Sequence, residues 1–388
     1  MLPSLRLLHL RQRLRQPLSY PLSHSLSSPF SSSTSYERKT PLEHVLLRPG
    51  MYVGRTDATV IDTWVLKQGR MHRASVTYHP ALLKIFDEIL VNAADNRARD
   101  RSMTRVDVRA DITPEGELRI SVHNDGKGIP VSKHRTEKIY IPELVFGHLL
   151  TGSNFDDSVA RLTGGSHGYG AKLTNIFSQQ FTVETADPKK GLLYMQTWRD
   201  NMGTVGEPEV RVLGAGETGS YTSVTFVPDL ARFGITIPPP PTPTPEQEQG
   251  TQEQGTKKLQ LSDVPAATVT VADNTPSVNS FREYVELFGP LADADDISGG
   301  GGGGIVYTRV NPRWEIAVGL SPTGSFENIS FVNNVWTSRG GAHVNLVLGQ
   351  VCKALEAALA KKGISPSAAA LRSRLMLWVN CKIENPAF

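Results

Sequence analysis

A carboxylate and two amides recur at helical spacing in the segment HPALLKIFDEILVNAADNRARD (79–100). Glu88, Asn92 and Asn96 lie four residues apart, so a helix would place all three side chains on one face. The carboxylate could act as a general base on a water molecule, and an amide oxygen could bind Mg²⁺. A solvated polar face is the simpler interpretation, and this row alone does not decide between the two.

A second motif, HNDGKGIP (123–130), directly follows a predicted strand. Asp125 could accept a hydrogen bond from an exocyclic amine at the end of that strand. The glycines Gly126 and Gly128 would let the backbone approach a flat ring closely. An ordinary Asp-Gly turn is the alternative.

The third motif, LTGGSHGYGAKLTN (162–175), places four glycines before a predicted helix start. Backbone N–H groups there suit phosphate oxygens, and Lys172 adds positive charge. The spacing does not match G-x-x-x-x-G-K-[ST], which excludes a Walker-type loop. No dinucleotide-binding βαβ unit surrounds the motif, which excludes a Rossmann site.

Helices and half-buried strands must position these motifs. Segment 79–100 has apolar residues at helical spacing and Pro80 near its start, as helix N-termini often do. Further helices are predicted at 141–150 and 171–178. Alternating residues predict strands at 104–112, 117–125, 179–186, 194–200 and 221–229. This order predicts an α+β fold, an α/β sandwich with its helices on one face.

The composition changes after this region. Residues 237–258 are rich in Pro, Gln and Glu, and a second low-complexity patch, 293–304, ends in six glycines. Both are typical of extended, solvated segments, and a short amphipathic segment, 281–289, separates them. From residue 305 onward, strands and a long amphipathic helix at 344–363 are predicted.

Bulk properties narrow the class of protein. The chain has 388 residues and a net charge of only +3, which leaves the partner open. Cys352 and Cys381 are its only cysteines, so a disulfide framework is not expected. No apolar run reaches the roughly 18 residues of a membrane span, so no membrane partner is expected. Residues 1–35 are Arg- and Ser-rich without an acid, which is typical of a transit peptide or a disordered leader.

The order of the three motifs resembles the GHKL ATPase family, which includes gyrase-like topoisomerases, ninety-kilodalton heat-shock chaperones, mismatch-repair ATPases and histidine kinases. Longer strings resemble eukaryotic topoisomerase II: 36–54, 84–96, 141–157, 164–178 and 196–203. Two more, FVNNVWTSRGGAHVN (331–345) and WVNCKIENPAF (378–388), resemble its transducer domain. The resemblance implies a GHKL (Bergerat) ATPase domain over 36–236, a linker or insert over 237–304 and part of a transducer domain over 305–388.

The resemblance also implies roles for the matched residues. Glu88 would be the general base for the hydrolytic water, Asn92 would hold Mg²⁺, and Asn96 would lie near the phosphates. Asp125 would receive the adenine amino group, and Thr222 would support the adenine through its hydroxyl.

The remaining implied contacts surround the nucleotide. Gly126 and Gly128 would line the base pocket, while Ser153 and Asn154 would face the ribose and phosphate. The glycine-rich lid would wrap the triphosphate with Gly165, Ser166, His167, Gly168, Tyr169, Gly170, Ala171 and Lys172.

The sequence also departs from the family pattern. Ser166 and His167 stand where the lid has Arg-Asn, so a fixed positive charge is missing and weaker ATP binding is expected. Gly152 replaces a usual serine in the ribose loop. The Pro/Gln-rich stretch largely takes the place of a helix and a strand. The sequence stops at Phe388, before the family's Gln-Thr-Lys loop and DNA-cleaving domains, so we expect a fragment with slow turnover that leaves DNA topology unchanged on its own.

These features predict the ATP-binding, ATP-hydrolysing dimerisation gate of a type II topoisomerase. Two protomers would close around double-stranded DNA on ATP binding, in the nucleus or in a DNA-containing organelle such as a mitochondrion or plastid. One alternative is a catalytically inert module that binds nucleotide and dimerises. Another is a different GHKL ATPase, such as a chaperone or kinase relative.

Overall fold

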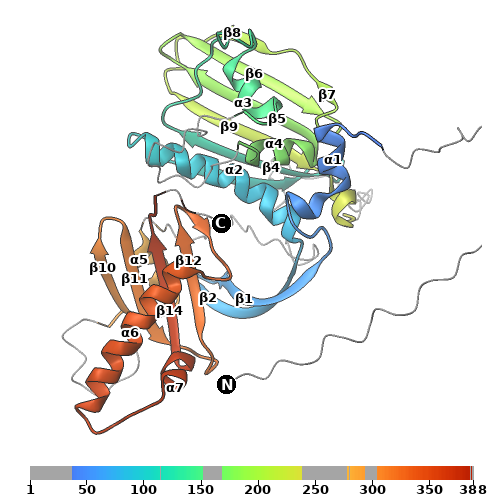
Figure 1. Ribbon diagram of the computed structural model, residues 1–388. Coiled ribbons are helices and arrows are strands. Elements are labelled where there is room, and N and C mark those ends of the chain that lie inside the picture. Colours follow the sequence, from blue (N-terminus) through green and yellow to red (C-terminus); the bar gives the residue numbers. More distant parts are fainter. Residues whose placement is uncertain are drawn as a thin grey trace, which may run out of the picture. The chain divides into compact units, whose positions relative to one another are not determined.

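The computed structural model describes residues 37–113, 115–151, 168–237, 278, 280–292, 304–384 and 386. The chain divides after Lys39, and the described residues from Thr40 onward belong to the larger of its two units. The larger unit contains a seven-stranded sheet, a five-stranded sheet and a two-stranded hairpin (Figure 1).

The seven-stranded sheet has the strand order β3-β4-β9-β5-β6-β7, with β8 also paired to β6. Every pairing in it is antiparallel. Its strands are β3 (Val106–Ile112), β4 (Leu118–Asp125), β5 (Ser178–Asp187), β6 (Leu192–Arg199), β7 (Thr204–Val205), β8 (Glu209–Val212) and β9 (Tyr221–Pro228). Five of these strands confirm the predicted ones, whereas β7 and β8 are too short to give a sequence signal.

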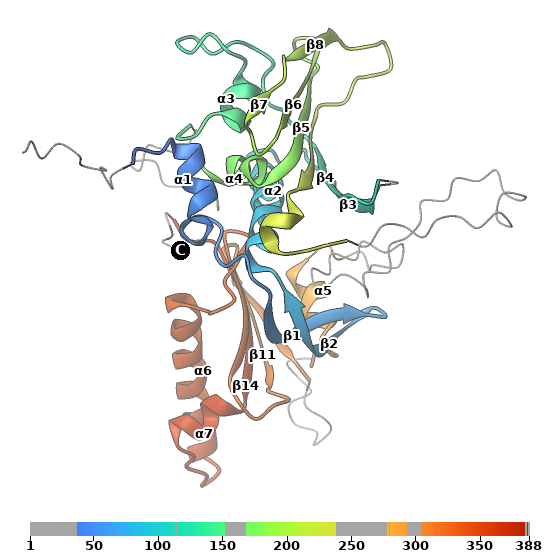
Figure 2. The same ribbon diagram turned by 90° about the vertical axis from the view of Figure 1, so that its right-hand side faces the viewer.

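Helices cover one face of this sheet (Figure 2). They are α1 (Pro41–Leu47), α2 (Pro80–Arg99), α3 (Ile141–Gly147) and α4 (Gly170–Ile176). A capping box at Thr40 and Glu43 begins α1. Helix α2 begins with Pro80 in its first turn and buries the predicted apolar stripe, including Leu82, Phe86 and Ile89. The α/β sandwich predicted from the sequence is confirmed.

The core of the sandwich lies between this helical layer and the sheet. Phe146 of α3, Phe181 of β5 and Trp198 of β6 are almost fully buried, with ring centroids 6.0–6.1 Å apart for the pairs that include Phe181. Aromatic side chains bury large areas and dominate the energetics of such cores. This cluster fixes the sheet beneath the helices that carry the candidate site.

The five-stranded sheet has the order β10-β11-β14-β12-β13. Strands β12 and β14 pair in parallel and are joined by helices, as parallel neighbours require. The elements are β10 (Val306–Asn311), β11 (Trp314–Leu320), β12 (Glu327–Val332), β13 (Val335–Trp336), α6 (Ala342–Ala360), α7 (Ala368–Ser373) and β14 (Leu375–Cys381). The predicted long helix is α6, and it begins two residues before the predicted start.

Strand β14 is buried on both faces, which explains its unbroken apolar run LMLWV. Leu375, Leu377 and Val379 pack with α6, whereas Met376 and Trp378 belong to a separate cluster on the other face. That second cluster also contains Val285 of α5 (Phe281–Glu286), the helix of the predicted 281–289 segment, which ends three residues early.

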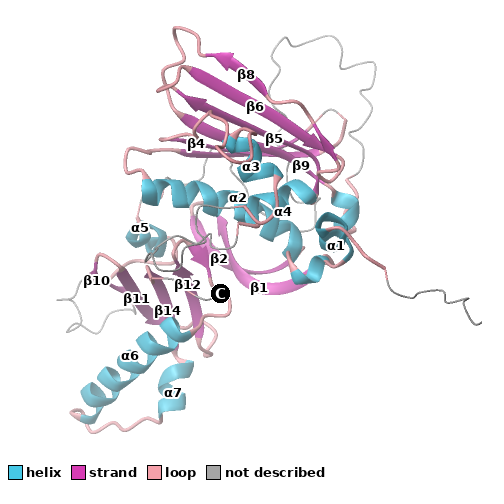
Figure 3. Ribbon diagram, turned by 45° about the horizontal axis from the view of Figure 1, so that its top comes forward, coloured by secondary structure: helices cyan, strands magenta, loops and turns pink. Residues whose placement is uncertain are grey.

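The hairpin of β1 (Thr59–Lys67) and β2 (Arg70–Tyr78) has no counterpart among the sequence predictions. Trp64 of β1 joins the aromatic cluster beside Phe288, and its Nε1 donates to Glu327 Oε2 at 3.2 Å. Arg73 forms an ion pair with the other oxygen of Glu327 at 2.7 Å. The hairpin therefore ties the chain before α2 to the five-stranded sheet (Figure 3).

Among the described residues, no helix combines the length and apolar character needed to cross a membrane.

Replacing Phe181 with Ala should destabilise the seven-stranded unit, because its fully buried ring lies between two other aromatic side chains. Core Phe→Ala substitutions typically cost about 3–5 kcal/mol. Urea denaturation followed by tryptophan fluorescence measures the change. Val212→Ala is the matched control, since Val212 is 75% exposed and should shift the midpoint little. Equal shifts in both variants would contradict the assigned core.

Candidate active site

The row on α2 forms as predicted, at the edge of the helix's buried face. Glu88 and Asn96 are partly buried, and Asn92 is exposed. Glu88 Oε1 forms an ion pair with Lys84 one turn earlier. Burial raises the pKa of the neighbouring Asp87 to about 6. The helix therefore presents a carboxylate and two amides beside a packed core rather than on a fully solvated face.

Glu88 lies directly against the first residue of α4. A Cβ atom on Gly170 would overlap with Glu88 Oε2, so only glycine fits there without moving the carboxylate. A hydrogen bond of 2.7 Å from Thr174 Oγ1 to the carbonyl of Ile85 also joins the two helices. The structure thus brings the first and third motifs together, although they are some eighty residues apart in the sequence.

Asp125 ends β4, and its carboxylate accepts hydrogen bonds from the turn that precedes β3. Oδ1 accepts from the backbone N–H groups of Thr104 and Arg105, both at 2.8 Å. Oδ2 accepts from Thr104 Oγ1 at 2.6 Å. Burial works to raise the pKa of Asp125, but these hydrogen bonds outweigh it and hold the pKa below its usual value.

Close packing by neighbouring protein atoms explains why this motif has its two glycines, and the sequence alone does not show this packing. Gly126 has φ +86°, and a Cβ atom there would lie 2.6 Å from Met103 Cβ. A Cβ atom on Gly128 would lie 2.5 Å from the carbonyl oxygen of Ala186 and 2.8 Å from that of Tyr221. Neighbouring protein atoms therefore require glycine at both positions, with or without a ligand beside the backbone.

Asn96 joins the first motif to the second. Its Nδ2 donates to the carbonyl of Lys127 at 3.2 Å. Asp100, the C-cap residue that follows α2, holds the same loop because its Oδ2 accepts from the Lys127 N–H at 2.6 Å. Hydrogen bonds from Ser102 and Lys127 lower the pKa of Asp100. Sequence reasoning missed Asp100, although an acid in the last position of a predicted helix, two residues before Ser102, was a visible turn signal.

Thr222 lies on β9, opposite Asn124 of β4 and Thr185 of β5. Its Oγ1 is 3.3 Å from Thr185 Oγ1. The Thr185 hydroxyl in turn accepts from the Ile129 N–H at 3.0 Å. Thr185 was also missed, because a threonine in a strand gives no sequence signal beyond β propensity.

Lys172 is buried, with only 3% of its surface exposed. Its Nζ donates to the carbonyl of Thr151 at 2.6 Å, at the start of the predicted ribose loop. Burial lowers the pKa of Lys172 to about 8. Next to it, Ala171 is buried, and Tyr169 lies with its ring centroid 6.2 Å from that of Tyr52. Gly168 has φ +67°, a conformation that favours glycine.

Five predicted site residues lie outside the described residues: Ser153, Asn154, Gly165, Ser166 and His167. The described part of the site is therefore the α2 row, the loop after β4, Thr222 and the residues from Gly168 to Lys172.

A site for Mg²⁺ would have to rely on few protein ligands. Among the described residues, no group of three or more His, Cys, Asp or Glu side chains is arranged to hold a metal ion. Asn92 is exposed, and its amide makes no side-chain hydrogen bond within that part of the chain. This fits Mg²⁺, which is usually held by one or two protein groups together with water and the phosphates of a substrate.

Two family models match the chain. Residues 78–232 match the histidine kinase-, DNA gyrase B- and HSP90-like ATPase family, and residues 294–388 match DNA gyrase B. The ATPase region of Saccharomyces cerevisiae topoisomerase II has a similar structure, with a TM-score of 0.73 at 40% identity, over 92% of this chain and 88% of that one. The chain belongs to the DNA topoisomerase II family. The second model and this likeness separate it from the chaperones and kinases of the same fold.

Two further relatives are also topoisomerase II proteins. The ATPase and transducer domains of topoisomerase II from Balamuthia mandrillaris give a TM-score of 0.72 at 40% identity, over 91% of this chain and 86% of that one. DNA topoisomerase 2 of Candida glabrata is 41% identical over 92% of this chain. The chain spans about a quarter of the length of that relative, 25%.

Replacing Lys172 with Met should remove a pH dependence of stability at alkaline pH. The folded-state pKa of about 8 lies below the ordinary value of 10.5, so between these values the unfolded chain binds more protons. The free energy of unfolding of the unmodified chain should therefore rise with pH from about 8 to 10.5, relative to Lys172→Met.

Urea denaturation at intervals from pH 7 to pH 10.5 tests this difference. Lys353→Met is the control, because Lys353 is exposed and should leave the pH profile of the unmodified chain unchanged. Parallel profiles for the unmodified chain and Lys172→Met would show that the Lys172 ammonium is not buried.

Proposed function

We propose that this chain binds ATP and hydrolyses it, as the dimerisation gate of a type II DNA topoisomerase. The observation that carries the proposal is the contact of Glu88 with Gly170, which joins a candidate base to the lid that would hold phosphates. We further propose an ATPase domain over 36–236 and part of a transducer domain over 305–388, with residues 237–304 between them.

Asp125 suits the adenine amino group by its hydrogen-bonding capacity. An ionised carboxylate offers about four acceptor positions, and three are used by Thr104 and Arg105. Oδ2 accepts only one of these bonds, so it can accept another from an exocyclic amine. The lowered pKa of Asp125 keeps the group ionised near neutral pH. Thr222, across from Asn124, places a hydroxyl at the neighbouring strand.

Glu88 suits the role of general base for phosphoryl transfer to water. Its carboxylate would accept a proton as the water oxygen bonds to the γ-phosphorus and the bond from that phosphorus to the bridging oxygen breaks, releasing ADP. The ion pair with Lys84 and the packing against Gly170 hold the carboxylate at the start of α4. Asn92, one turn later, would hold Mg²⁺, which supplies charge stabilisation to the phosphates.

We also propose that the full-length protein acts on double-stranded DNA, as a homodimer that closes on ATP binding. The names of the relatives support DNA as the substrate, and their eukaryotic sources support the nucleus as its location. The Arg- and Ser-rich, acid-free first 35 residues support a DNA-containing organelle instead.

Asp125→Ala should weaken the binding of adenine nucleotides by roughly ten- to a hundredfold or more. A charge-assisted hydrogen bond in a partly buried pocket contributes about 1.5–3 kcal/mol. Isothermal titration calorimetry with a non-hydrolysable ATP analogue measures the loss. Because Asp125 also holds the turn before β3, Thr104→Val serves as the matched control, since it removes one of the bonds to the turn and leaves the carboxylate. Unchanged affinity in Asp125→Ala would refute the adenine assignment.

Glu88→Gln should keep ATP binding and lose roughly 10²–10⁴-fold in hydrolysis, the usual contribution of a positioned general base. Phosphate release by the purified chain measures turnover. Gly170→Ala should lower turnover in the same direction, because its Cβ displaces the carboxylate. Gly219→Ala is the control, as nothing lies within 4 Å of its Cβ position.

Three outcomes are informative. Loss of turnover in Glu88→Gln with intact binding supports the proposal. Intact turnover in Glu88→Gln makes Glu88 a surface residue. An unmodified chain that binds the analogue but releases no phosphate would instead be an inert nucleotide-binding module.

A further inference from the structure

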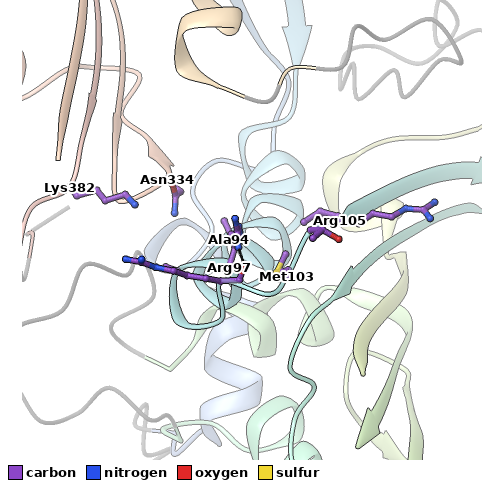
Figure 4. A pocket seen from close by; sticks show the side chains of 10 residues that line it. Ala94, Arg97, Met103, Arg105, Asn334 and Lys382 are labelled. Atoms are coloured by element: carbon purple, nitrogen blue, oxygen red, sulfur yellow. Dashed lines mark hydrogen bonds between the residues drawn. The ribbon is translucent and has the colours of Figure 1, made fainter. Parts of the chain in front are cut away.

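A cavity lies at the C-terminal end of α2, with a volume of about 620 Å³. Its walls come from the last turns of α2, the turn leading to β3, the turn between β12 and β13, and the residue after β14. Asn334 and Lys382 line it from the five-stranded sheet, and Arg97 extends toward their side (Figure 4). Segments distant in the sequence therefore converge on one concave surface.

The lining is strongly basic. Arg97, Arg101, Arg105 and Lys382 contribute cationic side chains, and among the described residues no Asp or Glu belongs to the wall. Arg105 is paired with Asp107, and its side chain points away from the Asn334 side of the cavity (Figure 4).

The other three cations have no acidic partner in the described part of the chain. Among the described residues, Arg97 donates to the carbonyl of Arg101 alone, and most of its guanidinium donors are left available. Arg101 and Lys382 form no ion pair there. The acid nearest to Lys382 in sequence, Glu384, is paired with Arg313. Because like charges repel, three unpaired cations around one cavity raise its affinity for anions.

Helix-end electrostatics explains only part of this arrangement. Cations in the last turn of a helix interact favourably with its dipole, which accounts for Arg97. It does not account for Lys382, which follows a strand of the other sheet, or for a cavity large enough to hold a small ligand. Guanidinium groups bind phosphate through paired hydrogen bonds, and an ammonium adds a point charge.

We propose that this cavity binds phosphate groups, supplied either by the backbone of a DNA duplex or by a free polyphosphate. The duplex source rests on the proposed function, whereas the free polyphosphate does not. The cavity is separate from the candidate active site, because none of Arg97, Arg101 and Lys382 belongs to the residues assigned to ATP.

The wall of the cavity also borders the candidate active site. Thr104 and Arg105 line it and hold the carboxylate of Asp125. A ligand that fixes this turn would therefore favour one position of Asp125. We expect phosphate and nucleotide to change each other's affinity by the same factor, as linkage requires.

The test uses the full chain without nucleotide and two probes, a fluorescent duplex of about 20 base pairs and inorganic tripolyphosphate. The cavity variant combines Arg97→Gln, Arg101→Gln and Lys382→Gln. For the duplex, the slope of log K against log salt concentration should fall by about 2–3, close to 0.9 for each lost contact. Tripolyphosphate binding, measured by calorimetry, should weaken roughly tenfold or more, as three charge-assisted contacts are lost.

The control variant combines Arg70→Gln, Arg109→Gln and Arg119→Gln. All three side chains are exposed and outside the cavity wall, so the net charge falls equally. Circular dichroism and thermal melting confirm that both variants fold, and single substitutions at the same positions replace any triple variant that does not.

A selective loss of tripolyphosphate binding in the cavity variant supports the proposal with a free polyphosphate as the source. A selective loss of duplex binding supports it with the DNA backbone as the source. If neither probe binds the unmodified chain, or the control loses as much as the cavity variant, the proposal is overturned. A chain that fails to bind ATP but selectively loses tripolyphosphate binding in the cavity variant would refute the proposed function and leave this inference standing.

Discussion

The close packing of α4 on α2 is the constraint on which the candidate site depends. Helix α2 must bury its apolar stripe against the sheet, which leaves Glu88 at the edge of the buried face. The first residue of α4 then touches that carboxylate, and any residue other than glycine there would displace it. The bond from Thr174 to Ile85 fixes the spacing of the two helices. The geometry of the candidate site and the packing of the core are thus set by the same contact, so a change to either affects both.

A second set of contacts holds the loop after β4 from three directions. Asn96 and Asp100 of the α2 end bind Lys127, while Ser220 Oγ accepts from the Gly128 N–H at 2.7 Å. Asp125 is in turn bonded to the turn before β3. A loop with this many bonds to separate elements is held in one conformation before any ligand arrives. Such preorganisation lowers the ordering cost of binding a flat, polar ligand.

The sequence predicted the parts of the fold whose side chains follow a strict period. Helix α2 and the strands β3, β4, β5, β6 and β9 each bury one face, so their apolar residues repeat regularly. The hairpin β1–β2 escaped prediction because most of its positions are partly exposed on both faces. Its role depends on Trp64 and Arg73 meeting Glu327, a pairing across more than 250 residues that no local pattern encodes.

At the candidate site, the sequence likewise predicted which residues share a face but not what surrounds each of them. The spacing of Glu88, Asn92 and Asn96 predicted their shared face, and Gly126, Gly128 and Gly170 were singled out among the glycines of the two loops. The reason that positions 126 and 128 require glycine was not predicted. Neighbouring protein atoms leave no room for a Cβ atom at Gly126 or Gly128. Lys172 was expected to present its charge to phosphates, yet its ammonium is buried against a carbonyl. Residue types and their spacing can be read from a sequence. The burial of a side chain and its hydrogen-bond partners depend on the folded chain.

The β1–β2 hairpin connects the five-stranded sheet to the start of α2, the helix that carries Glu88. Strand β2 ends at Tyr78 and α2 begins at Pro80, so only His79 separates the hairpin from the helix that carries Glu88. His79 is buried and lies 3.0 Å from the carbonyl of Thr56 through its Nδ1, which stiffens this junction. At the far end of α2, the carboxylate of Asp100 fixes the loop after β4. Glu327 and the hairpin therefore connect the five-stranded sheet to the start of α2, and the buried stripe of α2 holds Glu88 and Asn96 on the same packed element.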